Sequence, residues 1–200
     1  MNYLFLFLSF IITTSYTYAQ TTGEYKTEYK EYIGPSADIL RYCYVWDTKS
    51  GNAVRYYFTA ERTWVKGKSL LPTNPVNVKG TDIGEVMLCT SEYPDSKGII
   101  NKVVYYYSTK TGKVVRYYLS EAGKWEKSTA ELDNPIESSQ TKVGELTMNA
   151  IEYYNAQDVQ FRTLFFCNTI TGKTVRYYFS HEQKKWLKSD VALPDNPTKQ

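Results

Sequence analysis

The sequence from Thr109 to Tyr118 reads TKTGKVVRYY, and two close variants of it occur elsewhere in the chain. Residues 48–57 read TKSGNAVRYY, and residues 169–178 read TITGKTVRYY. Inward and outward side chains alternate after the glycine, which is the pattern of a β-strand. A run of aromatic and β-branched residues precedes each copy. Two such runs joined by a short loop with glycine predict a β-hairpin, with turns at Gly51, Gly112 and Gly172.

The hairpin belongs to a longer repeat with a period of 60 to 61 residues. Each copy opens on Gly-Glu, continues with Glu-Tyr, and closes on Asn-Pro. After each hairpin comes a tryptophan with a lysine two residues further on, at Trp64, Trp125 and Trp186. Self-similarity at a period of this size indicates a repeat architecture. We place the copies at approximately 23–80, 84–140 and 144–200.

Every copy predicts β structure throughout, with about four strands and almost no helix. The first strand of the second copy is expected at 85–93, with Val86 and Leu88 inward, and a short fourth strand carries Trp125. The fold class is therefore all-β, with three tandem antiparallel units. A closed threefold, β-trefoil-like arrangement is favoured because closure removes exposed sheet edges. Propeller-like blades and three small β beads are the alternatives.

Residues 1–19 contain no charged side chain and combine an apolar run with a small-residue end at Ala19. An apolar run of about 10 residues is typical of a secretory signal peptide and is too short to span a bilayer. We expect cleavage after Ala19, leaving one repeat domain, 20–200, in a secreted or periplasmic protein. No later segment predicts a membrane span.

The composition is rich in tyrosine, with 20 Tyr among 200 residues, which suits half-buried β surface. A net charge of +3 with interspersed signs argues against nucleic acid as a partner. Three cysteines, Cys43, Cys89 and Cys167, allow at most one disulfide within the chain.

The sequence offers little for catalysis. His181 is the only histidine, and no motif predicts a metal site, a cofactor or a nucleophile elbow. Glu31, Glu92 and Glu152 recur in all copies and could supply a carboxylate pair to a hydrolase. The simpler interpretation is that each pairs with the arginine of Val-Arg-Tyr-Tyr on a neighbouring strand.

Repeated arginine, tyrosine and tryptophan residues are the candidate ligand contacts. The arginine and the second tyrosine of each hairpin lie opposite the inferred core face, and aromatic rings beside cationic donors suit sugars or peptides. The candidates are Arg55, Tyr57, Trp64, Arg116, Tyr118, Trp125, Arg176, Tyr178 and Trp186. We expect a non-catalytic binding or surface-associated protein that recognises an extracellular glycan or protein. A carboxylate-dependent hydrolase acting on extracellular polymer is the alternative.

Overall fold

A computed structural model describes residues 24–33, 39–73, 75–76, 82–95, 97–130, 132, 142–155 and 157–190. The predicted signal peptide, 1–19, lies outside these residues. The described part contains strands and turns, with no helix and therefore none that could cross a membrane.

Three four-stranded sheets follow one another along the chain, which confirms the all-β class and the three tandem units. Each sheet is an antiparallel meander in which consecutive strands pair. Unit 1 consists of β1 (Tyr25–Ile33), β2 (Ile39–Asp47), β3 (Ala53–Phe58) and β4 (Trp64–Lys66). Unit 2 consists of β5 (Val86–Pro94), β6 (Ile100–Ser108), β7 (Val114–Leu119) and β8 (Trp125–Lys127). Unit 3 consists of β9 (Leu146–Tyr154), β10 (Gln160–Asn168), β11 (Thr174–Ser180) and β12 (Lys185–Lys188).

The hairpin glycines have the conformation that the repeat predicted. Gly51, Gly112 and Gly172 have φ angles of 72°, 71° and 73°. This left-handed region favours glycine because it has no Cβ. Each amide donates a hydrogen bond to the carbonyl four residues earlier, as Gly112 does to Ser108 at 2.9 Å. The repeated phrase therefore encodes the turn between the second and third strands of every unit.

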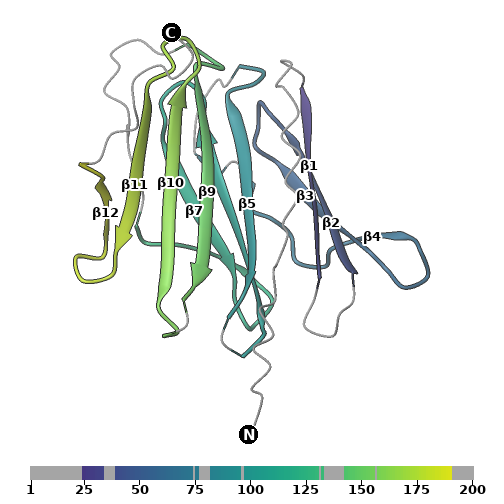
Figure 1. Ribbon diagram of the computed structural model, residues 1–200. Coiled ribbons are helices and arrows are strands. Elements are labelled where there is room, and N and C mark those ends of the chain that lie inside the picture. Colours follow the sequence, from purple (N-terminus) through teal and green to yellow (C-terminus); the bar gives the residue numbers. More distant parts are fainter. Residues whose placement is uncertain are drawn as a thin grey trace, which may run out of the picture.

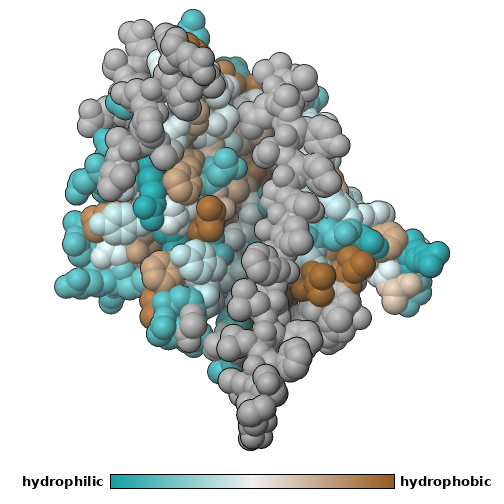
Figure 2. Space-filling model, in the orientation of Figure 1, coloured by the Kyte–Doolittle hydropathy of each residue, from teal (hydrophilic) through white to brown (hydrophobic). Residues whose placement is uncertain are grey.

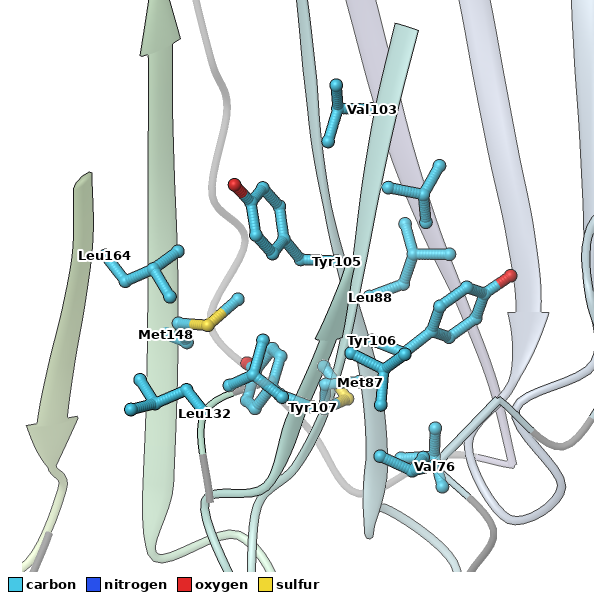
Figure 3. Packing of buried hydrophobic residues seen from close by; sticks show 14 of the residues in the cluster. Val76, Met87, Leu88, Val103, Tyr105, Tyr106, Tyr107, Leu132, Met148 and Leu164 are labelled. Atoms are coloured by element: carbon cyan, nitrogen blue, oxygen red, sulfur yellow. The ribbon is translucent and has the colours of Figure 1, made fainter. Parts of the chain in front are cut away.

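The sheets stand side by side in chain order, with unit 2 between units 1 and 3 (Figure 1). Each sheet has a forward face, turned toward the next unit, and a backward face, turned toward the previous one. Side chains alternate between these faces along a strand. In β6, Tyr105 and Tyr107 lie toward Leu164 and Met148 of unit 3, whereas Tyr106 lies on the opposite side (Figure 3).

The core consequently fills both spaces between the sheets. The inward candidates Val86, Leu88, Leu146 and Met148 are all buried, as expected. The expectation of one core face and one outer face is incomplete, because Arg116 faces unit 3 and is itself buried. A sheet enclosed on both sides has no solvent face.

Closure into a threefold domain is not confirmed. Strands pair only within their own unit, and the hydrogen bonds described below join unit 1 to unit 2 and unit 2 to unit 3. Separate four-stranded meanders stacked face to face match the blade alternative, because blades of a propeller are sheets of this kind. Stacking buries the sheet faces without any shared strand pairing, and this leaves units 1 and 3 as the two ends of the stack.

Candidate ligand-binding clefts between the units

A threonine of the repeated turn forms hydrogen bonds that join one unit to the next. Thr48 Oγ1 donates to the Glu24 carbonyl of unit 1 at 3.0 Å and accepts from Gly84 N, at the start of unit 2, at 2.9 Å. The Thr48 carbonyl also accepts from Val86 N at 2.7 Å. The turn therefore supplies both a hydroxyl and a carbonyl to each junction.

The junction between units 2 and 3 repeats this arrangement. Thr109 Oγ1 donates to the Gly84 carbonyl at 2.8 Å and accepts from Gly144 N at 2.9 Å, and the Thr109 carbonyl accepts from Leu146 N at 2.9 Å. Both Thr48 and Thr109 are buried. The same contacts thus fix the spacing of the sheets at both junctions.

In units 2 and 3, a glutamate on the first strand accepts hydrogen bonds from side chains of the preceding unit. Glu152 accepts from Arg116 Nε at 2.7 Å and Nη2 at 2.9 Å, from Tyr93 Oη at 2.7 Å, and from Tyr105 Oη. Its own unit adds Arg162, whose Nε lies 3.9 Å away. The side chains of Arg116 and Glu152 are 5% and 0% exposed, so this ion pair is almost wholly removed from water.

The charge state of this pair follows from its contacts. Burial opposes ionisation of Glu152, but hydrogen bonds from Arg116, Tyr105 and Tyr93 lower its pKa nevertheless. Burial likewise lowers the pKa of Arg116, and the Glu152 carboxylate more than offsets this and raises it. Both groups are therefore charged at neutral pH, as the paired arrangement requires.

The junction between units 1 and 2 is a looser version of the same cluster. Glu92 accepts from Tyr44 Oη at 2.7 Å and Tyr32 Oη at 2.9 Å, but Arg55 Nε lies 3.4 Å from its Oε1. The Arg55 guanidinium stacks 3.8 Å above the centre of the Tyr42 ring. The simpler sequence interpretation, in which each repeated glutamate pairs with a hairpin arginine, is confirmed for Glu92 and Glu152, whose arginine belongs to the preceding unit. It is wrong for Glu31, which pairs with Arg41 of its own unit.

Beside each cluster lies a cleft between the two units. The cleft at the second junction has a volume of about 430 Å³, and the cleft at the first has a volume of about 330 Å³. Both contain the arginine and second tyrosine of the hairpin, Arg116 and Tyr118 or Arg55 and Tyr57. Both also contain the three residues after the short fourth strand of the earlier unit. The two clefts thus occupy the same place in the repeat.

The second cleft is rich in cationic groups. Its lining holds five of them: Lys102, Arg116, Lys127, Arg162 and Lys184. Aromatic rings line it as well: Tyr93, Tyr118, Tyr154 and Phe179. Among the described residues no carboxylate contributes to the lining, because Glu152 lies beneath Arg116 and Tyr93.

Local pKa values show that cations lie close together at both junctions. At the first junction, burial lowers the pKa of Lys102, and Arg55 lowers it further while Glu92 opposes the change. Burial and the adjacent Arg116 also lower the pKa of Arg162. Cations that destabilise one another in this way favour an anionic ligand.

The first cleft contains an unused donor. Trp125 of unit 2 lines it together with Arg55, Tyr57 and the segment 67–69 of unit 1. The Trp125 Nε1 atom is buried and has no hydrogen-bond partner in the described part of the chain. An indole N–H normally finds a partner when buried, so this donor is available to a ligand.

The nine candidate residues therefore fall into three environments. Arg55, Tyr57, Arg116, Tyr118 and Trp125 line the two clefts. Trp186 is half-buried and packs edge-on against Tyr105 across the second junction, with ring centres 6.4 Å apart. The exposed remainder lies on the two end units: Trp64 on unit 1, and Arg176 and Tyr178 on unit 3.

Sequence reasoning missed the second-strand cation of each unit, at Arg41, Lys102 and Arg162. It lies ten residues before the hairpin glycine in every copy, so the repeat alignment carried the signal.

His181 is an exposed loop residue, with Nε2 2.7 Å from the Gln160 carbonyl. The described residues contain no cluster suited to a metal ion. All three cysteines are free and half-buried.

Comparison with known proteins adds little. No protein-family model matches the sequence, and no curated protein matches it. The crystal structure of AofleA from Arthrobotrys oligospora aligns with 84% of this chain and 70% of its own, at 12% sequence identity and a TM-score of 0.34. A likeness at this level supports neither a fold assignment nor a function.

Proposed function

We propose that the protein is an exported, non-catalytic binding protein whose clefts between units hold saccharides that carry negative charge. The observation that carries this proposal is the lining of the second cleft, where Arg116, Arg162 and Lys184 lie with four aromatic residues around a volume of about 430 Å³. Aromatic faces pack against sugar rings, and guanidinium or ammonium donors bind carboxylates or sulfates. Export rests on the apolar leader of the sequence.

The alternative hydrolase needs a carboxyl group that stays protonated to act as a general acid, and such a group has a raised pKa. The pKa of Glu152 is lowered instead. Glu92 and Glu152 are also tied to arginine and tyrosine side chains that hold the units together. These contacts favour a structural role for the repeated glutamates.

The proposal is tested by isothermal titration of the exported chain with two hexasaccharides that differ only at C6. Galacturonic acid hexamer carries a carboxylate on each ring, and galactose hexamer carries a hydroxymethyl group. We expect binding of the acidic sugar that weakens as salt is raised, and at least tenfold weaker binding of the neutral one. Equal affinity for both sugars, or no binding of either, would contradict the proposal.

A matched pair of variants locates the site. Lys184→Gln removes one cation from the second cleft, whereas Lys97→Gln removes one from an exposed turn outside it. We expect the first to weaken binding several-fold and the second to leave it unchanged. Because the Lys184 side chain is exposed, Lys184→Gln should leave the melting temperature unchanged. Weaker binding with intact stability therefore reports on the cleft.

A further inference from the structure

The two end faces of the stack, the forward face of unit 3 and the backward face of unit 1, carry the residues that meet each other at an internal junction. On the forward face of unit 3, Thr169 and Arg176 occupy the repeat positions of Thr109 and Arg116 but are exposed. Thr169 Oγ1 still donates within its own unit, to the Gly144 carbonyl at 3.1 Å. The Arg176 guanidinium has no hydrogen bond or ion pair to any described residue, although the Arg176 carbonyl accepts from Ser189 N at 2.9 Å. Unit 3 therefore presents the side chains that bind the next unit at an internal junction, and no described residue contacts Arg176 in this way.

The backward face of unit 1 presents the complementary half. Glu31 matches Glu92 and Glu152, and its Oε2 accepts from Arg41 Nε of its own unit at 2.6 Å. Tyr29, also of unit 1, donates to it at 3.0 Å. The arginine and tyrosines that a preceding unit would supply are missing, and Glu31 remains 41% exposed. A carboxylate at one end thus matches an unpaired guanidinium at the other.

Both end faces also expose apolar and aromatic side chains. Figure 2 shows hydrophobic patches at the surface over the lower ends of β1 and β2. Strand β1 ends at Ile33 and strand β2 begins at Ile39. Tyr25 is exposed, whereas Val86 and Leu146 at the same repeat position are buried. On the forward face of unit 3 the exposed side chains are Ile151, Tyr153, Phe161 and Tyr178.

We propose that the forward face of unit 3 docks on the backward face of unit 1 of a second copy of this chain, head to tail. Arg176 and Tyr153 then reach the partner's Glu31, and Thr169 meets the strand that begins at Tyr25, as Thr109 meets Leu146. This inference does not depend on the proposed ligand. The fit of the two faces follows from the repeat, since each has the residues of an internal junction.

The number of copies follows from the same geometry. A head-to-tail contact that repeats one rotation either closes into a ring or continues as a filament. Propellers of four-stranded sheets close with about four to eight blades. Two copies with three units each supply six, the only multiple of three in that range. The expected assembly is therefore a dimer that forms a ring of six units.

Dimerisation also completes a further cleft at each new junction. Unit 3 contributes Arg176 and Tyr178, the counterparts of Arg116 and Tyr118. The partner's unit 1 contributes Phe58 and Trp64, the counterparts of Leu119 and Trp125 in the first cleft. Trp64 is 45% exposed in the single chain. The partner thus supplies half of a site that one chain leaves open.

The test is the mass of the mature chain in solution, measured by light scattering after gel filtration and by sedimentation velocity, without ligand. We expect twice the mass of one chain at about 50 μM. Arg176→Glu places two carboxylates together and should raise the dimer dissociation constant at least tenfold. The double variant Glu31→Arg with Arg176→Glu restores opposite charges and should recover most of the affinity.

Lys124→Glu is the matched control, because it makes the same charge change at an exposed turn away from either end face. It should leave the dimer intact, and circular dichroism should show that every variant folds. A single-chain mass up to 200 μM would overturn the proposal. So would an open series of larger species, or a dimer that Arg176→Glu weakens no more than Lys124→Glu does.

Discussion

Replacing Arg116 with methionine should unfold the protein more easily than any comparable change on its surface. The substitution keeps an unbranched, flexible stem and removes the guanidinium that gives Glu152 two hydrogen bonds, at 2.7 and 2.9 Å. Removing one partner of a buried ion pair costs about 3–5 kcal/mol, because the remaining charge is left in a poorly solvating site. Arg162 and two tyrosine hydroxyls still contact Glu152, so we expect the lower end, about 3 kcal/mol.

Urea unfolding followed by tryptophan fluorescence measures this loss. With a slope of about 2 kcal/mol per molar urea, the midpoint should fall by roughly 1.5 M. Arg55→Met removes a longer contact, 3.4 Å to Glu92, and should cost about 1.5 kcal/mol. Lys124→Met, at an exposed turn, should change stability by less than about 0.5 kcal/mol.

A double variant separates the charge from the packing. Glu152→Gln removes the charge but keeps an oxygen that can accept from Tyr93 and Tyr105. In the presence of Glu152→Gln, Arg116→Met leaves no buried charge unpaired, so the double variant should be more stable than Arg116→Met alone. The reasoning fails if Arg116→Met costs less than about 1 kcal/mol, or if the double variant is the less stable of the two.

Three further predictions concern the junctions. The folded-state pKa of Glu152 lies below its ordinary value of 4.5, so the stability that its ionised form contributes is present above pH 4.5 and is lost as the pH falls further. In the Glu152→Gln variant, the free energy of unfolding should therefore depend less on pH in the acid range. Thr109→Val removes a buried hydroxyl that is hydrogen-bonded to Gly84 and Gly144, so the melting temperature should fall, with a loss of about 1–3 kcal/mol in the free energy of unfolding. An unchanged melting curve would mean that these hydrogen bonds do not stabilise the junction. Gly51→Ala places a Cβ 2.9 Å from Val86 Cγ1 at a φ of 72°, and should therefore destabilise more than Gly144→Ala, whose Cβ meets nothing within 4 Å; urea midpoints would contradict this if the order were reversed.

The sequence was sufficient for the strands, the turns and the number of units, because these depend on local pattern. Val86 and Leu88 alternate with a period of two, and Gly112 needs its left-handed φ whatever surrounds it. The arrangement of the units could not be obtained in the same way. It depends on contacts such as Thr109 with Gly144, between residues 35 apart in the chain, which periodicity within one unit does not encode.

The site was predicted in part for the same reason. Alternation along the strand predicts that Arg116 and Tyr118 lie on an outer face opposite the core, yet that face packs on unit 3. Alternation along a strand distinguishes two faces but does not show which of them another sheet covers. The sequence of one strand does not show that Arg55 of unit 1 lies near Lys102, or that Arg116 of unit 2 lies near Arg162.

The three copies of one arginine show that position along the stack, rather than local sequence, determines what a repeated residue does. Arg116 has a unit on each side and is buried against Glu152, Arg55 makes a longer contact with Glu92, and Arg176, which no described unit follows, is exposed. The three described units form two clefts that contain the hairpin arginine and tyrosine, because each such cleft needs residues from two neighbours. Head-to-tail pairing of two chains would give six junctions, since every unit would then have a neighbour on both sides. Six sites facing a polymeric saccharide gain avidity, because each contact after the first is intramolecular. Assembly would therefore strengthen binding to a polymer far more than binding to a short oligosaccharide.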